Sequence, residues 1–167
     1  GTYSKSSGNP NLKPEFFTQT EWSNLWKWEK STFNFSIYFK NQSDIIGRWF
    51  FIENIEDREV SHSKFENLGN IFSGGTDISG MFSVGKLVVR PGLNLYLTKI
   101  MGSKFASTLD KEQVSYSIKI NTNYPITEKI KLQVSANYES PFISVYGKQF
   151  EHYYFDAGIR ARMLKNR

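Results

Sequence analysis

The sequence predicts an all-β fold in which about seven antiparallel up-and-down strands form a segment of a transmembrane β-barrel. Three observations lead to this prediction. Apolar and polar residues alternate in successive runs, the connections between runs are alternately short and long, and aromatic residues gather at the ends of the apolar faces. Alternation indicates strands, because successive side chains point to opposite faces of a sheet.

Composition narrows the class of protein. The chain has 167 residues, of which 39% are hydrophobic and 22% charged, and this suits one folded domain. No apolar run approaches the roughly 18 residues of a membrane helix, whereas a barrel strand needs an apolar residue only at every second position. The absence of cysteine excludes disulfides and thiolate metal sites. The net charge of +5 is spread along the chain, so we expect no nucleic-acid partner.

The first two alternating runs, Phe16–Trp28 and Thr32–Asn41, predict an antiparallel hairpin around a short break at residues 29–31. In the second run the apolar positions are Phe33, Phe35, Ile37 and Phe39, and the polar-parity positions are Thr32, Asn34, Ser36, Tyr38 and Lys40. The stretch that follows, residues 42–64, has no sustained period. It therefore indicates a long loop.

Five further runs complete the predicted strands. They cover residues 66–84, 87–100, 114–121, 129–139 and 152–162. Gly74, Gly75 and Gly80 interrupt the first of these runs, and interior glycines often mark places where a sheet bends. Pro91 interrupts the next run, and we expect it at an edge, a bulge or an irregular turn.

Two regularities indicate which solvent each face meets. The connections are short near residues 29–31, 85 and 123–128, and long at 42–64, 101–112 and 140–149, as in outer-membrane barrels. Aromatic residues at the ends of the apolar faces suit the headgroup regions, and they are Trp26, Trp28, Tyr124, Tyr138 and Tyr153. We therefore expect the apolar parity to face lipid. The alternative is a soluble antiparallel β-sandwich binding module, for carbohydrate for example, with the apolar parity as its core.

Five segments resemble the carboxy-terminal barrel of TonB-dependent receptors, and in particular the outer-membrane β-barrel family of Bacteroidetes-type bacteria. They are GNPNLKPE (residues 8–15), SIYFKNQSDII (36–46), ENLGNIFSGGTDIS (66–79), NYESP (137–141) and GKQFEHYYFDAGIRARMLKNR (147–167). They span nearly the whole chain in the family's order. The chain departs from the family at residues 74–77, where Gly-Gly-Thr-Asp replaces a more usual Tyr-Gly-x-Glu.

The resemblance implies a barrel of about 22 strands closed around an amino-terminal plug. It also implies location in the outer membrane of a Gram-negative bacterium and import of a nutrient driven by TonB. The implied partners are membrane lipid, the rest of the barrel, the plug, TonB through an amino-terminal part, and an unidentified imported ligand. We expect residues 1–167 to be a single partial domain that lacks the plug and the last strands. A passive porin without a plug is the other membrane alternative.

The sequence shows no recognisable set of catalytic residues. We therefore expect that the protein is not an enzyme and that it binds no metal and no cofactor. The two histidines, His62 and His152, are expected at the surface. Asp156, Arg160 and Arg162 share one face of a strand at even spacings and, with Asp77, form a candidate network in the barrel lumen. A structural network with neighbouring strands or the plug is favoured over contact with a passing substrate.

The loop at residues 47–60 is the other candidate site. Arg48, Trp49, Phe50 and Phe51 follow one another there, and exposed aromatic clusters often mark binding sites. Ligand capture is one interpretation. The favoured one is an extension of the strands above the membrane, with aromatic packing between loops.

Overall fold

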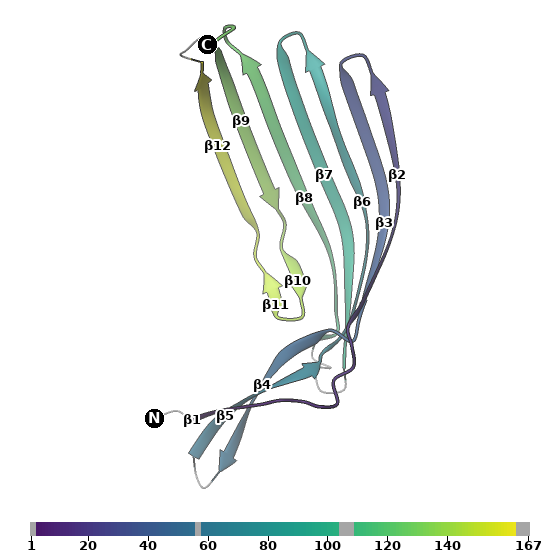
Figure 1. Ribbon diagram of the computed structural model, residues 1–167, viewed down its shortest axis with the longest axis vertical. Helices are drawn as coiled ribbons and strands as arrows, with labels where there is room; N and C mark the ends of the chain where they lie inside the picture. The colour runs from purple at the N-terminus through teal and green to yellow at the C-terminus, as the bar shows by residue number, and fades with distance from the viewer. Residues whose placement is uncertain (1–2, 56–57, 104–108, 163–167) are drawn as a thin grey trace, which may run out of the picture.

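A seven-stranded antiparallel sheet dominates the computed structural model, which describes residues 3–55, 58–103 and 109–162 (Figure 1). Its strands are β2 (Phe16–Trp28), β3 (Ser31–Ser43), β6 (Gly69–Val84), β7 (Leu87–Gly102), β8 (Lys111–Pro125), β9 (Ile130–Glu139) and β12 (His152–Ala161). Each of these strands pairs with the next one named. The all-β, up-and-down prediction is confirmed. In the described part of the chain, no helix has the length and hydropathy to cross a membrane.

The connections at one end of this sheet are tight turns. Residues 29–30 join β2 to β3, residues 85–86 join β6 to β7, and residues 126–129 join β8 to β9. Gly85 has a φ of +60°, which suits the first central position of a two-residue hairpin turn. The longer connections all lie at the opposite end (Figure 1). The predicted alternation of connection lengths is therefore confirmed.

The two faces of the sheet differ in chemistry, row by row. Strand register aligns one apolar-face row across all seven strands, consisting of Asn24, Phe35, Ile78, Leu93, Ile118, Tyr138 and Tyr153. In a soluble protein the apolar side chains are buried and the polar ones exposed, and this sheet shows the reverse. Ile37 is 48% exposed and Phe39 51%, whereas Ser36 and Tyr38, on the polar face of the same strand, are only 2% and 8% exposed.

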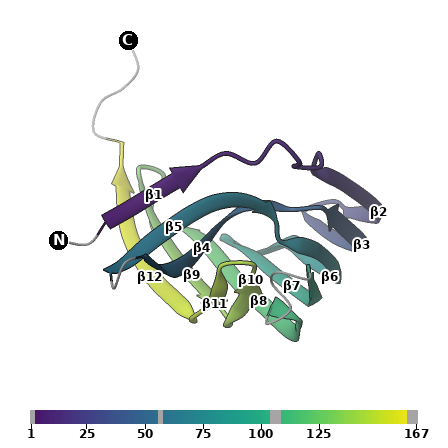
Figure 2. The same ribbon diagram turned by 90° about the horizontal axis from the view of Figure 1, so that it is seen from below.

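Curvature of the sheet places the polar residues on the inner side. Figure 2 shows the seven strands as a trough, with the three-stranded sheet β1–β5–β4 lying across its open side. No second sheet covers the apolar face within residues 3–55, 58–103 and 109–162. The soluble sandwich alternative is therefore wrong, because in a sandwich the apolar parity would be the buried one.

The three-stranded sheet corrects the prediction of a loop at residues 42–64. It consists of the hairpin β4 (Ile46–Ile55) and β5 (Arg58–Asn67), with β1 (Tyr3–Ser7) added in parallel to β5. The connection at 140–149 likewise contains a small hairpin, β10 (Phe142–Ser144) and β11 (Gly147–Gln149). The β4–β5 hairpin has exposed side chains on both faces, so its sequence lacks the alternation that marks the membrane strands.

A small apolar core lies where the long connections meet the seven-stranded sheet. Its buried residues are Ile45, Leu68, Ile100, Ile143 and Val145, and Trp49, Ile71 and Leu109 pack against it. Leu68 shares the parity of the apolar-face residues Phe72 and Ile78 in the sequence, but it is 2% exposed in this core. Gly69, the first residue of β6, has a φ of +135° and redirects the chain at this point.

Hydrogen bonds between backbone and side-chain groups fix the three-stranded sheet β1–β5–β4, here called the extension, to the seven-stranded sheet. The Asn67 amide donates to the carbonyl oxygens of Asp44 (2.7 Å) and Lys13 (3.0 Å), and its oxygen accepts the Lys13 N–H at 2.9 Å. The Asp44 N–H donates to the side-chain oxygen of Asn70 at 2.9 Å. Asp44 has a φ of +53°, a conformation that Asp and Asn adopt more readily than most residues. Residues far apart in sequence are therefore locked together at one corner.

Glu15 strengthens the same corner. One of its carboxylate oxygens accepts the Ile46 N–H at 3.0 Å, and the other accepts the Gln42 side-chain amide. The bond from Ile46, and then the one from Gln42, lowers the pKa of this carboxyl, because both favour its ionised form.

We expect the Glu15 contact to be lost in acid. Because the pKa is lowered in the folded state, the stabilisation is present above the ordinary carboxyl pKa of about 4.3 and is lost as the pH falls through the lowered value. In the full-length protein, the hydrogen-exchange protection factor of the Ile46 amide should fall over that range. Glu15→Gln should reduce protection at neutral pH and remove its pH dependence, while the control Glu29→Gln, in a turn at the other end, should change neither. Unchanged protection in Glu15→Gln would contradict this assignment.

The two faces should also respond differently to charge. Ile118 is at the midpoint of β8 and points to the apolar side, so Ile118→Arg should lower the free energy of unfolding in lipid by roughly 2–4 kcal/mol. Ser117→Arg, one position away on the polar face, should cost clearly less, because water and polar groups surround it. Denaturant titration of the full-length protein in liposomes measures both values. Equal losses would count against the assignment of faces.

Candidate functional site

A polar row crosses the inner face of all seven strands. The register aligns Ser23, Ser36, Asp77, Asn94, Ser117, Glu139 and His152, each opposite the next. Every member of the row carries a hydrogen-bonding or ionisable group, and in neighbouring rows of this face Ser115 is 1% and Asn137 6% exposed. The inner wall is therefore suited to water or to polar groups of another segment, and not to hydrocarbon.

Asp77, Asn94 and Tyr38 form a connected group within this wall. The Asn94 amide donates to the Asp77 carboxylate at 2.8 Å and to the Tyr38 hydroxyl at 3.0 Å. The Lys40 ammonium lies 4.5 Å from the centre of the Tyr38 ring, which is a cation–π contact. The group borders a cavity of about 370 Å³ that Ser117 and Lys119 also line. One carboxylate between two lysines gives this cavity a basic edge.

Gly75 makes room for this arrangement. It pairs with Tyr38 on one side and Tyr96 on the other. A Cβ at this position would lie 2.8 Å from the Tyr38 hydroxyl oxygen and 2.6 Å from the Tyr96 Cβ. The Leu95 carbonyl oxygen would be nearer still, at 2.5 Å, so any larger residue would displace the paired backbone of β7 and the Tyr38 hydroxyl.

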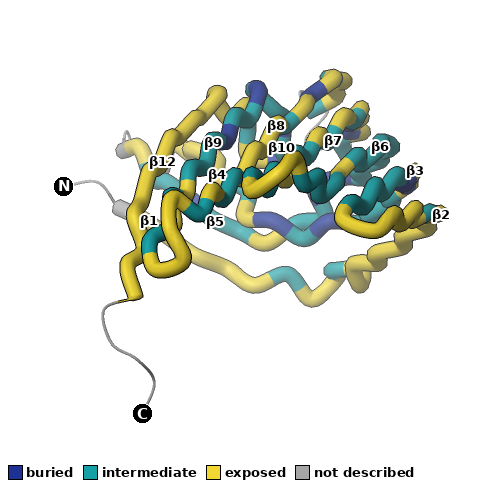
Figure 3. Tube along the Cα trace, turned by 90° about the horizontal axis from the view of Figure 1, so that it is seen from above, coloured by how far each residue is buried: buried dark blue, intermediate teal, exposed yellow. Residues whose placement is uncertain are grey.

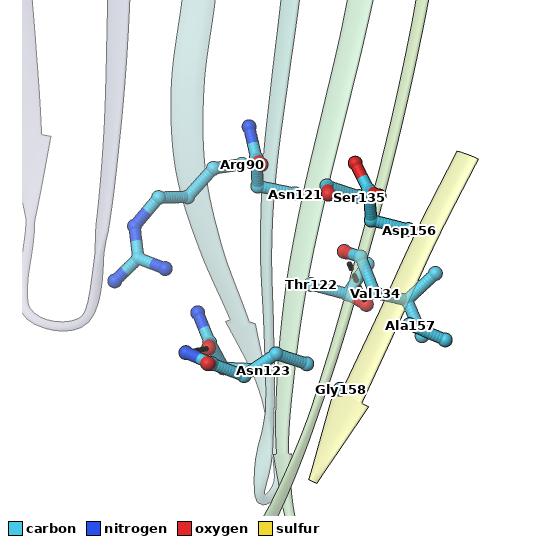
Figure 4. A pocket seen from close by; sticks show the side chains of 10 residues that line it. Arg90, Asn121, Thr122, Asn123, Val134, Ser135, Asp156, Ala157 and Gly158 are labelled. Atoms are coloured by element: carbon cyan, nitrogen blue, oxygen red, sulfur yellow. Dashed lines mark hydrogen bonds between the residues drawn. The ribbon is translucent and has the colours of Figure 1, made fainter. Parts of the chain in front are cut away.

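A second cavity, of about 540 Å³, lies nearer to the tight turns. Its polar lining residues are Arg90, Asn121, Thr122, Asn123, Gln133, Ser135 and Asp156. The Gln133 amide donates to the Asn123 side-chain oxygen at 2.8 Å, which fixes one wall. Figure 4 shows Arg90 and Asp156 on opposite sides of this cavity, so that both charges remain available to a group between them.

The four residues of the predicted lumen network do not come together. Asp77 is in β6, while Asp156 and Arg160 are in β12. Three strands lie between β6 and β12 in the sheet. On β12, Asp156 lies opposite Ser135 and Arg160 opposite Lys131, and the Arg162 N–H donates to the Lys129 carbonyl at 2.8 Å. No ion pair joins these four residues in the described ranges. Their contacts with a plug or a substrate stay predictions, and Tyr38 and Asn94 are the site residues that sequence reasoning missed.

The four candidate ligand residues of the extension lie on β4 and have different surroundings. Trp49 packs against the apolar core, so it has a structural role. The Arg48 guanidinium lies 5.3 Å from the centre of the Phe65 ring. Phe50 is 62% exposed and Phe51 42%. Packing therefore accounts for part of this cluster, and ligand contact by Phe50 and Phe51 stays a prediction.

The two histidines have different surroundings. His62, expected at the surface, is 8% exposed because its ring stacks on Phe51 with centroids 5.0 Å apart. Its Nε2 lies 3.1 Å from a Glu53 carboxylate oxygen, without the geometry of a hydrogen bond. The exposed His152 lies 3.1 Å from Glu139. In the described part of the chain, no group of three His, Asp or Glu side chains is placed to hold a metal ion.

The edges of the sheet are the last feature of the site. Every residue of β12 is exposed, and so is every residue of β2 except Asn24 (Figure 3). Each of these strands pairs on one side only, so a row of backbone N–H and C=O groups is left open. Long strands with open backbone edges are suited to further strands on either side.

Comparisons with known proteins agree with this geometry. No curated protein sequence matches the chain. Among solved structures, a mutant of the ferric enterobactin receptor from Pseudomonas aeruginosa is similar in fold, with a TM-score of 0.64 and 13% sequence identity. The similarity covers 95% of this chain and 25% of that receptor, so the chain spans about a quarter of its length. The model of the outer membrane protein beta-barrel family matches residues 2–167, and the chain therefore belongs to that family.

Proposed function

We propose that the chain is part of the barrel of a TonB-dependent outer-membrane transporter that imports a nutrient into the periplasm. One observation carries the proposal: a continuous polar row crosses the concave face of seven strands whose convex face is apolar. Such a wall belongs to a barrel wide enough to hold water or a polar segment. The proposal assigns the chain a transport role and no enzymatic activity.

The inner wall is compatible with a plug inside the barrel. The two cavities have volumes of about 370 and 540 Å³, and amide, hydroxyl and charged groups line both. The hydrogen-bonding groups around these two cavities could contact the polar surface of a folded domain inside the barrel. The likeness to the ferric enterobactin receptor supports the barrel fold alone.

The rest of the barrel is the partner that the sheet edges require. A strand in hydrocarbon must satisfy its backbone hydrogen bonds, and β2 and β12 each do so on one side only. We propose that further strands of the same protein pair with both edges. TonB would act through an amino-terminal part of the same protein.

A permeability measurement separates this proposal from a passive porin. Liposomes that contain the full-length protein should not swell faster than empty liposomes in an isotonic solution of a small sugar. A variant that lacks the amino-terminal plug should admit the sugar. Rapid swelling with the intact protein would contradict the plugged transporter and favour the porin.

The TonB part of the proposal needs a separate measurement. The periplasmic domain of TonB should bind the full-length protein in detergent, and removal of the amino-terminal part should abolish binding. Absence of binding by the intact protein would overturn TonB dependence while leaving the barrel assignment intact.

A further inference from the structure

The apolar face contains a hollow between β3, β6, β7 and β8. Its volume is about 230 Å³, and its apolar walls include Phe33, Ile78, Phe82, Pro91, Leu93 and Ile120. Elsewhere this face carries many large exposed side chains, such as Trp22, Leu95 and Phe155. The hollow is therefore a distinct feature of the surface that meets lipid.

The backbone is irregular beside the hollow, at Gly80 and Pro91. Gly80 pairs with Phe33 and follows Ser79, which lines the hollow. A Cβ on Gly80 would lie 2.6 Å from the Phe82 ring and 2.8 Å from the Thr32 carbonyl oxygen, so a larger residue does not fit. Pro91 has no N–H, and the pairing of β6 with β7 is interrupted between Ser79–Gly92 and Phe82–Val89. The Phe82 ring therefore lies over Gly80, and the hollow borders a break in the strand pairing.

The hollow faces the hydrocarbon of the outer membrane, and this identifies its occupant. An empty apolar hollow loses dispersion contacts that a flexible hydrocarbon chain can supply. Most of its lining residues are aromatic or aliphatic, with Ser79 and Lys119 the polar exceptions, and such walls suit an acyl chain better than a polar ligand. The tight turns lie on the periplasmic side of such barrels, so the chain belongs to a lipid of the periplasmic leaflet.

A lysine lies in the turn that joins two strands of the hollow, β6 and β7. Lys86 is exposed in the β6–β7 turn, five positions before Pro91, which corresponds to about 16 Å along the strand. That distance is comparable with half of the roughly 30 Å hydrocarbon thickness. In the other two turns a carboxylate accompanies the lysine, with Glu29 beside Lys30 and Glu128 beside Lys129. Only the turn below the hollow presents a lysine without a carboxylate neighbour.

We propose that the hollow and Lys86 form a binding site for one anionic phospholipid of the periplasmic leaflet. One acyl chain occupies the hollow, and the phosphate lies at the Lys86 ammonium. The inference rests on the orientation of the two faces in the membrane and is independent of the transport role.

Spin-labelled lipids test the site in the full-length protein reconstituted into phosphatidylcholine vesicles. The motionally restricted fraction of the electron paramagnetic resonance spectrum is measured for phosphatidylglycerol and phosphatidylcholine that carry the label on the same acyl carbon. We expect phosphatidylglycerol to be preferred by about fivefold, the effect of one lysine near the surface. Lys86→Gln should abolish the preference, and Leu93→Trp, which fills the hollow, should reduce the restricted fraction of both lipids.

Matched controls make the result specific. Lys30→Gln removes a lysine from the neighbouring turn and should preserve the preference. Leu95→Trp enlarges an exposed residue two positions from Leu93, outside the hollow, and should leave both restricted fractions unchanged. Equal restriction of the two lipids by the unmodified protein would overturn the proposal. So would equal effects of Lys86→Gln and Lys30→Gln, or of Leu93→Trp and Leu95→Trp.

Discussion

Backbone hydrogen bonding between neighbouring strands is the constraint on which the rest of this structure depends. Hydrocarbon offers no partner to an N–H or C=O group, so each membrane strand must obtain its partners from other strands. The five inner strands of the sheet are paired on both sides, with ladders that run along most of each strand. Pro91 is the exception, and the ladder opens beside it. With the backbone satisfied, side chains are free to match the solvent on each face.

The side chains are then arranged in the reverse of a soluble protein, with polar groups buried and apolar groups exposed. Ser36 and Ser115 are almost fully buried, whereas Ile118 is 41% exposed and Trp22 57%. In the part of the chain that the structure describes, the buried aliphatic side chains lie in the small core around Leu68 and Ile100, which anchors the long connections. The apolar face of the sheet obtains its contacts from lipid. In water the same face would be an uncovered hydrophobic surface and a site of aggregation.

The membrane strands could be predicted from sequence because their two faces meet different solvents. Residues 32–40 alternate between polar-parity and apolar positions, and so do the runs in β8 and β9; β12 follows the same pattern apart from Tyr154. The β4–β5 hairpin escaped prediction because water reaches both of its faces, which leaves no period to detect. Its parallel pairing with β1 joins Tyr3 to Val60, and no local pattern indicates a contact so distant in sequence.

The polar site required the register as well as the strands. A two-residue turn at Gly85–Lys86 places Asp77 opposite Asn94. Knowing the exact two residues of this turn would therefore have been enough to predict the contact. The candidate network assumed that the charged residues Asp156, Arg160 and Arg162, which share one face of a single strand, interact with one another. Arg160 in fact lies opposite Lys131, a like charge, which gives it no ionic partner across the strands. Spacing along one strand therefore identifies a face but not the contacts made across it.

The central claim is that the two faces of the sheet meet different solvents. Residues Ile118, Lys119, Ile120 and Asn121 are consecutive on β8 and all are exposed, so only the kind of solvent distinguishes them. Nitroxide labels placed singly at these positions in the reconstituted full-length protein report collisions with oxygen, which concentrates in lipid, and with a water-soluble nickel chelate. We predict high oxygen accessibility at 118 and 120 and high nickel accessibility at 119 and 121. The same accessibility at all four positions, or the reverse alternation, would contradict this account.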